Sequence, residues 1–156
     1  MLTYLNYFLA SIIAYLGLLL GVILIKFAPE EQKPGKQYFI LLKKILFFLI
    51  LFFLMLFYKV NTILTVILLF FVIILMLNKK INLNKLGLIY FFLGVVFYLS
   101  YFIKIFNLFT IETVLIFLFG IPTSSLILKL KKKNYYNIFV KNLWFFVPIV
   151  LLYFIF

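Results

Sequence analysis

Long apolar runs separated by short polar intervals make up the whole chain. Six of these runs approach the length of about 20 residues that a helix needs to cross about 30 Å of hydrocarbon. The apolar runs are solid, whereas a transmembrane β-barrel would alternate apolar and polar residues. The pattern predicts an all-α, polytopic transmembrane bundle that forms a single integral membrane domain over residues 1–156. Its expected spans are 4–25, 38–58, 61–77, 86–103, 110–128 and 137–156.

Composition supports a lipid environment. The chain is 69% hydrophobic and 22% aromatic, and a soluble domain of this size could not keep its surface polar with so few polar residues. The strong use of Lys, Asn, Ile, Phe, Tyr and Leu also follows from AT-rich codons, so neither the aromatic excess nor the absence of arginine indicates a function.

The net charge of +12 comes entirely from lysine. In a soluble protein such a charge would indicate nucleic-acid binding, but here the lysines gather at the ends of the expected spans. Membrane topology explains them better, so no nucleic-acid partner is expected. The expected partner is the lipid bilayer, with anionic headgroups beside the lysines on the inner face.

The lysines are distributed unevenly between alternate loops. The first, third and fifth loops, with the adjoining span ends, hold thirteen of the fifteen lysines, and the other two loops hold only Lys59 and Lys104. Because loops rich in lysine stay inside, the counts predict six spans with both termini outside, most simply in the cell membrane. Lys43 and Lys44 lie within the second expected span, and we expect both to extend back to the interface.

Small residues recur on one side of the first expected span. The spacings of four, three and four place them on a single helix face, and two of them form a GxxxG motif: Ala10, Ala14, Gly17 and Gly21. In lipid, small residues allow two helix backbones to approach closely. This helix-packing face is expected either to pack against another span of the same chain or to mediate dimerisation.

The longest polar interval is Ala28–Tyr38, which we call the elbow. Pro29 suits the first position of a short interfacial helix with Glu30 and Glu31 at its positive end, and Pro34-Gly35 is a turn signal that ends such a helix. Two interpretations remain open: a solvated structural turn, or a docking loop for a partner or for lipid headgroups. The residues of this inside loop are Pro29, Glu30, Glu31, Pro34, Gly35 and Lys36.

The elbow also carries a resemblance. Ala28-Pro-Glu-Glu31 followed by Pro34-Gly-Lys-Gln-Tyr38 resembles a loop in small multi-span archaeal membrane proteins. The resemblance covers about eleven residues. It implies a multi-pass membrane fold and no particular activity.

The fifth expected span contains the most polar stretch at membrane depth. A proline removes a backbone hydrogen bond there, and nearby hydroxyls can satisfy the freed carbonyl. The stretch predicts either an ordinary proline kink or a broken helix of the kind with which transporters bind substrates. Its candidate site residues, together with an acidic residue of the same span, are Glu112, Gly120, Pro122, Thr123, Ser124 and Ser125.

Glu112 has two interpretations of its own. Thr110 can cap the start of the fifth span, which would place Glu112 in the favourable first turn. Alternatively, its carboxylate faces a polar cavity.

The chemistry available to the chain is narrow. Without His, Cys or Asp, the sequence predicts no metal site, no cofactor and no histidine-based nucleophile. Ser125 and Lys129 share a helix face, but Lys129 belongs to a solvated basic run, so catalysis there is not expected. The leading hypothesis is a non-enzymatic subunit or scaffold of a membrane complex, with a protein partner or a second copy. The alternatives are a small transporter or channel subunit with a fifth helix broken at Gly120–Ser125, and a lipid-active enzyme.

Overall fold

The computed structural model describes residues 4–59, the positions 61, 63, 65–67, 70 and 74, and residues 86–128 and 135–155. Within these residues every regular element is a helix, so the all-α prediction is confirmed. Most of the expected third span, 61–77, lies outside the described residues, as do the loop 78–85 and the basic run 129–133. The elements are α1 (Tyr4–Phe27), η1 (Pro29–Gln32), α2 (Lys36–Phe57), α4 (Leu86–Phe102), α5 (Phe106–Ile127), α6 (Tyr135–Asn142), η3 (Leu143–Phe145) and α7 (Phe146–Ile155).

Four helical stretches are long and apolar enough to cross a membrane. They are α1, α2, α5 and the stretch Ile138–Ile155, which joins α6, η3 and α7. α4 is apolar but shorter. In the described part of the chain the expected span limits agree with the helices to within a few residues, and the largest difference is the start of α5. The protein is an apolar, membrane-embedded helical bundle.

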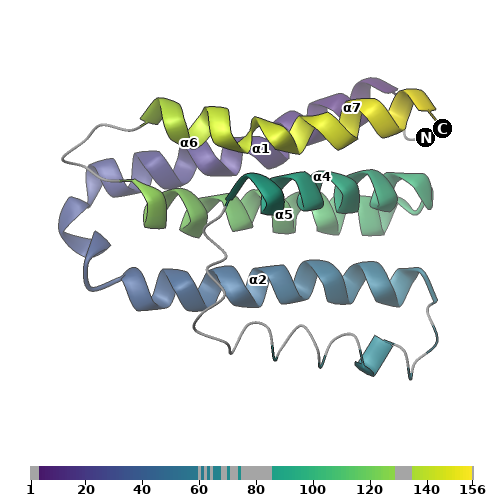
Figure 1. The fold of residues 1–156 in the computed structure, drawn as a ribbon, viewed down its shortest axis with the longest axis horizontal. Coiled ribbons are helices and arrows are strands. Elements are labelled where there is room, and N and C mark those ends of the chain that lie inside the picture. The colour runs from purple at the N-terminus through teal and green to yellow at the C-terminus, as the bar shows by residue number, and fades with distance from the viewer. Residues whose placement is uncertain are drawn as a thin grey trace.

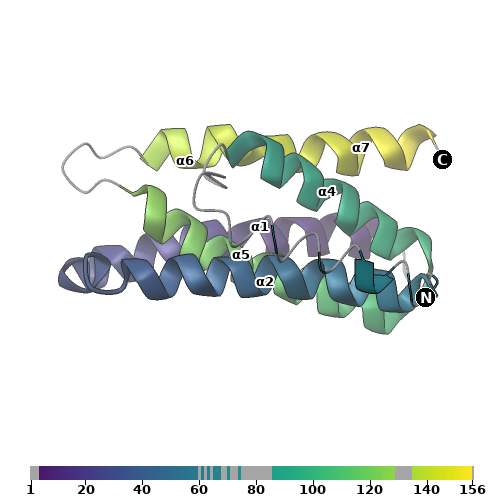
Figure 2. The same ribbon diagram turned by 60° about the horizontal axis from the view of Figure 1, so that its bottom comes forward.

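The helices lie alongside one another, with α1 and α5 running in one direction and α2, α4, α6 and α7 in the other (Figures 1 and 2). Both marked ends of the chain lie at one end of the bundle, which we call the termini end, and the elbow lies at the opposite, elbow end. α2 and α4 both finish at the termini end, where Lys59 and Lys104 adopt left-handed backbone angles with φ of 49° and 60°. The two lysine-poor turns therefore share one end of the bundle, and the lysine-rich elbow lies at the opposite end.

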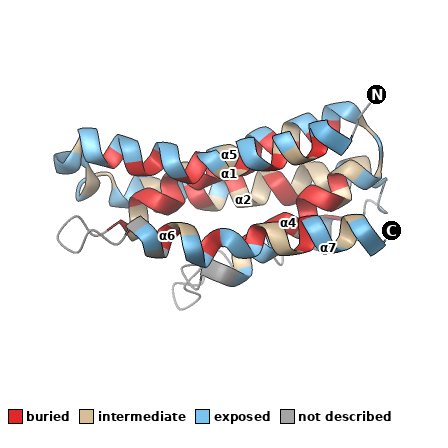
Figure 3. Cartoon of the chain, turned by 90° about the horizontal axis from the view of Figure 1, so that it is seen from above, coloured by how far each residue is buried: buried red, intermediate tan, exposed pale blue. Residues whose placement is uncertain are grey.

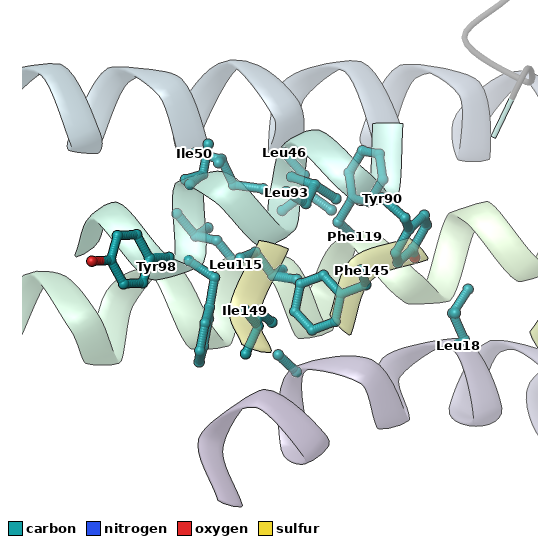
Figure 4. Close-up of a cluster of buried hydrophobic side chains, with 14 of the residues drawn as sticks. Leu18, Leu46, Ile50, Tyr90, Leu93, Tyr98, Leu115, Phe119, Phe145 and Ile149 are labelled. Carbon is teal, nitrogen blue, oxygen red and sulfur yellow. The ribbon is translucent and has the colours of Figure 1, made fainter. Parts of the chain in front are cut away.

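α5 is the central helix of the bundle. It packs against α1, α2 and α4, and buried residues follow it along its whole length (Figure 3). The core around it is largely aromatic. Figure 4 shows Phe119 of α5 among Tyr90 and Leu93 of α4, and Phe145 of η3 close by. The exposed side of α1 is apolar as well, as expected for a helix that faces hydrocarbon.

Candidate functional site

The polar stretch of α5 forms an unbroken helix. Pro122 lies inside the α-helix, which continues to Ile127, so of the two alternatives the broken helix at Gly120–Ser125 is the one that does not apply. The physical reason is that a proline removes only one backbone bond, the one to the carbonyl of Leu118, and the remaining bonds carry the helix through. Gly120, Pro122, Thr123, Ser124 and Ser125 are all buried.

The two serine hydroxyls of this stretch bond to their own helix. Ser124 Oγ donates to the carbonyls of Gly120 at 3.0 Å or Ile121 at 3.1 Å, and Ser125 Oγ donates to Ile121 at 2.8 Å. Such bonds satisfy serine side chains at membrane depth without a partner from another helix. Both serine hydroxyls are therefore satisfied within α5.

The small-residue face of α1 lies against α5. A Cβ atom added to Gly17 would overlap the backbone of Phe117, and one added to Gly21 would overlap Ile121 and Ser124. Gly120 opposes Gly17 from the other helix in the same way. Ala14 is buried and Ala10 is half-buried. The face is thus covered within the chain, which is the packing role that the sequence left open beside dimerisation.

The elbow is fastened to the end of α5. Gln32 turns inward, and its Nε2 donates to the carbonyl oxygens of Ser125 at 2.9 Å and Leu128 at 2.6 Å. These carbonyls belong to the last turn and the C-cap of α5, where backbone acceptors otherwise lack helical partners. The surrounding residues of the elbow point outward and are exposed: Pro29, Glu30, Glu31, Lys33, Pro34 and Lys36. Gly35 is half-buried and precedes α2. The result is a charged loop held in a fixed position.

Glu112 does not have the capping role that its sequence position suggested. α5 begins at Phe106, with Ile105 as its N-cap, because Leu108 and Phe109 bury their side chains as part of the helix. Thr110 is then inside the helix, and its Oγ1 donates to Phe106 O at 2.9 Å. Glu112 is fully buried, and neither of its carboxyl oxygens has a hydrogen-bond partner in the described structure. It is the strongest candidate for a functional side chain.

Lys43 also differs from its expectation. Only 3% of this side chain is exposed, and its Nζ lies 5.5 Å from the centroid of the Phe119 ring, in a cation–π arrangement. The expected extension to the interface is wrong for Lys43, while Lys44 is half-buried. The sequence did contain a signal for this burial. Lys43 lies three and seven residues before the buried Leu46 and Ile50, which places it on the same face of α2.

Tyrosine hydroxyls join the first helix to the last two. Tyr7 donates to Ile149 O at 3.1 Å, and Tyr15 donates to Phe139 O at 2.6 Å. Two further buried hydroxyls, on Tyr90 and Thr123, have no partner of good geometry among the described residues. Sequence reasoning did not single out these tyrosines, because their bonds link residues more than 120 positions apart.

An open groove of about 310 Å³ runs between α1 and α5 near the termini end. Its lining is mainly apolar and includes Leu9, Ala10, Phe109 and Thr113. Glu112 is not among its lining residues, so this groove is not the polar cavity of the alternative interpretation of Glu112.

Comparisons with known proteins add no further constraint. No protein-family model, no curated protein and no solved structure matches this chain. The functional assignment therefore depends on the geometry described above.

Proposed function

We propose that this protein is a non-enzymatic subunit or scaffold of a complex in the cell membrane, and that the elbow is its docking surface. The observation that carries the proposal is the double hydrogen bond from Gln32 to Ser125 and Leu128. It holds exposed charges of both signs in one arrangement before any partner arrives.

A loop that is already ordered loses little conformational entropy when it binds, which favours affinity. Charges on such a surface mainly determine which partner binds and how fast. Glu30 and Glu31 are exposed beside Lys33 and Lys36, so the surface offers both signs within seven residues. A partner segment of complementary charge at the membrane surface fits these properties.

Affinity purification from native membranes tests this proposal. We expect the full-length chain to co-purify a membrane protein, and we expect the Glu30→Lys/Glu31→Lys variant to lose it. Gln32→Ala should weaken recovery because the loop is released, whereas Lys59→Gln at the termini end should leave recovery unchanged. A chain that purifies alone, or a partner that is retained after charge reversal, would refute docking through the elbow.

A second candidate is a small transporter or channel subunit. Ionisable side chains inside a membrane usually mark a pathway for ions or substrates, and Glu112 and Lys43 are both buried at such depth. Reconstitution in liposomes separates the two functions. A transporter or channel should give an ion flux that Glu112→Gln abolishes, whereas a subunit alone should give none.

A further inference from the structure

Glu112 lies deep in the central helix. It follows the start of α5 by six residues, which is about 9 Å along the axis at 1.5 Å per residue. Its side chain is fully buried in a bundle whose outer surface is itself apolar. Buried apolar residues precede and follow it by about one turn on the same helix: Leu108, Phe109, Leu115 and Ile116.

No hydrogen bond joins Glu112 to the charged and titratable groups of the neighbouring helices in the described structure, although Tyr101 of α4 packs on Phe109, one turn before Glu112. Lys43 of α2 and Tyr90 of α4 both approach Phe119, which lies seven residues or about 10 Å further along α5. Tyr98 of α4 packs near the termini end on Phe102. Tyr7 of α1 stacks on Phe109 but gives its hydroxyl to Ile149 O. None of these groups forms a hydrogen bond to Glu112 in the described structure.

The apolar surroundings of Glu112 determine the charge state of its carboxyl group and the cation that it can bind. Native proteins seldom leave two buried carboxyl oxygens without partners, and an ionised, unpaired carboxylate costs several kcal/mol in a low-dielectric interior. A calcium or magnesium ion needs about six or more oxygen ligands, whereas the buried side chains one turn before and after Glu112 on α5 are hydrocarbon and the adjacent Thr113 offers one hydroxyl. A proton is the cation that one oxygen can hold alone.

We propose that Glu112 is a proton-binding site in the core and that proton release from it is coupled to a rearrangement around α5. In the packed form described here the side chain is the carboxylic acid. Release of one proton to water leaves one negative charge on the carboxylate, and the closed packing offers it no partner. The helices must then shift so that water or a cationic side chain reaches it. The inference is independent of the proposed docking function, because it concerns a different part of the molecule.

The small number of acidic residues makes this proposal directly testable by infrared spectroscopy. The chain has three Asp and Glu residues in total, so Glu30→Gln/Glu31→Gln leaves Glu112 as the single acidic side chain. In maltoside detergent, which has no carbonyl group, we expect this variant to show a carboxylic-acid C=O band at neutral pH. The band should disappear at a high pH at which the carboxylate band replaces it. Absence of the acid band at neutral pH would overturn the proposal, and the result does not require a Glu112 variant to fold.

A stability measurement gives the second test. A group that holds a proton in the folded state and loses it on unfolding makes stability fall as the pH rises. We therefore expect the thermal midpoint of the wild-type protein to fall between neutral and alkaline pH more steeply than that of Glu112→Gln, whose neutral amide has nearly the same shape. Lysines and tyrosines titrate equally in both proteins, so the difference isolates Glu112. Identical pH profiles would refute the coupling.

Discussion

Two helix interfaces in this bundle achieve close packing by opposite means. Between α1 and α5, the glycines at 17, 21 and 120 let the backbones touch, and an added Cβ would overlap main-chain atoms. Between α4 and η3, rings fill the space: Phe145 lies 5.9 Å from Phe97 and 6.3 Å from Tyr90, centroid to centroid.

The difference shows where this fold is rigid and where it can adapt. In lipid the hydrophobic effect does not drive helices together, so both interfaces depend on van der Waals contact. Glycine is the smallest residue, so every substitution at a glycine backbone contact adds atoms where there is no space. An aromatic contact can instead repack around a different side chain of similar volume. The α1–α5 interface should therefore be intolerant of any substitution, and the α4–η3 interface should be sensitive mainly to lost volume.

The largest effect should come from emptying the aromatic interface. Phe145 is fully buried, and Phe145→Ala leaves a cavity among Tyr15, Tyr90 and Phe97. We expect a loss of about 3 kcal/mol in the free energy of unfolding, measured by titration of mixed micelles with a denaturing detergent. Phe154→Ala is the matched control, because Phe154 is 71% exposed and its loss should change little.

Gly120→Ala tests the glycine interface with a single added carbon. The new methyl group meets the backbone of Gly17 and Leu18, and overpacking of this kind costs about 1–3 kcal/mol. The volume-conserving change Phe145→Met should cost less than about 1.5 kcal/mol in the other interface. If Gly120→Ala lowers the free energy of unfolding by less than Phe145→Met does in the same assay, the proposed difference between the two interfaces is wrong.

Gln32→Ala should have a smaller and more local effect. It removes the donor of two hydrogen bonds to Ser125 and Leu128, and we expect a cost of about 1–2 kcal/mol. Hydrogen exchange followed by mass spectrometry should show faster exchange in residues 29–35. Gln37→Ala, at an exposed position, should leave that exchange unchanged. Equal protection in both variants would mean that the elbow is held by other contacts.

The smallest effect should follow Ser125→Ala. Among the described residues its hydroxyl donates only to Ile121 O of the same helix, and side-chain hydrogen bonds in membranes average about 0.6 kcal/mol. We expect a change of this order in the unfolding titration. A loss comparable to that of Gly120→Ala would show that the hydroxyl has a role beyond the local bond.

The sequence predicted those features that depend on local periodicity and on lysine placement. Solid apolar runs define the helices, and the lysine count places the elbow and the turns at Lys59 and Lys104 at opposite ends. The spacing of Gly17 and Gly21 marked a packing face, although it could not identify α5 as the partner, because that contact joins residues about 100 positions apart.

The errors arose where tertiary packing overrides a local signal. Threonine is a favoured N-cap residue, so Thr110 was expected to begin the helix, but burial of Leu108 and Phe109 moves the start of α5 to Phe106. Lys43 was expected at the interface because of its charge, whereas its phase on α2 turns it towards Phe119. For Pro122 the sequence left a kink and a broken helix both open, and the helix is continuous through it to Ile127.

The bonds made by Gln32 set an order of events during biosynthesis. The amide emerges from the ribosome 93 and 96 residues before the two carbonyls that it binds, and Tyr7 precedes its acceptor by 142 residues. The first hairpin can thus enter the membrane early, but its loop reaches its final form only after the fifth helix has been inserted. Closure of the bundle between Tyr7 and Ile149 consequently requires that the segments up to Ile149 have been inserted.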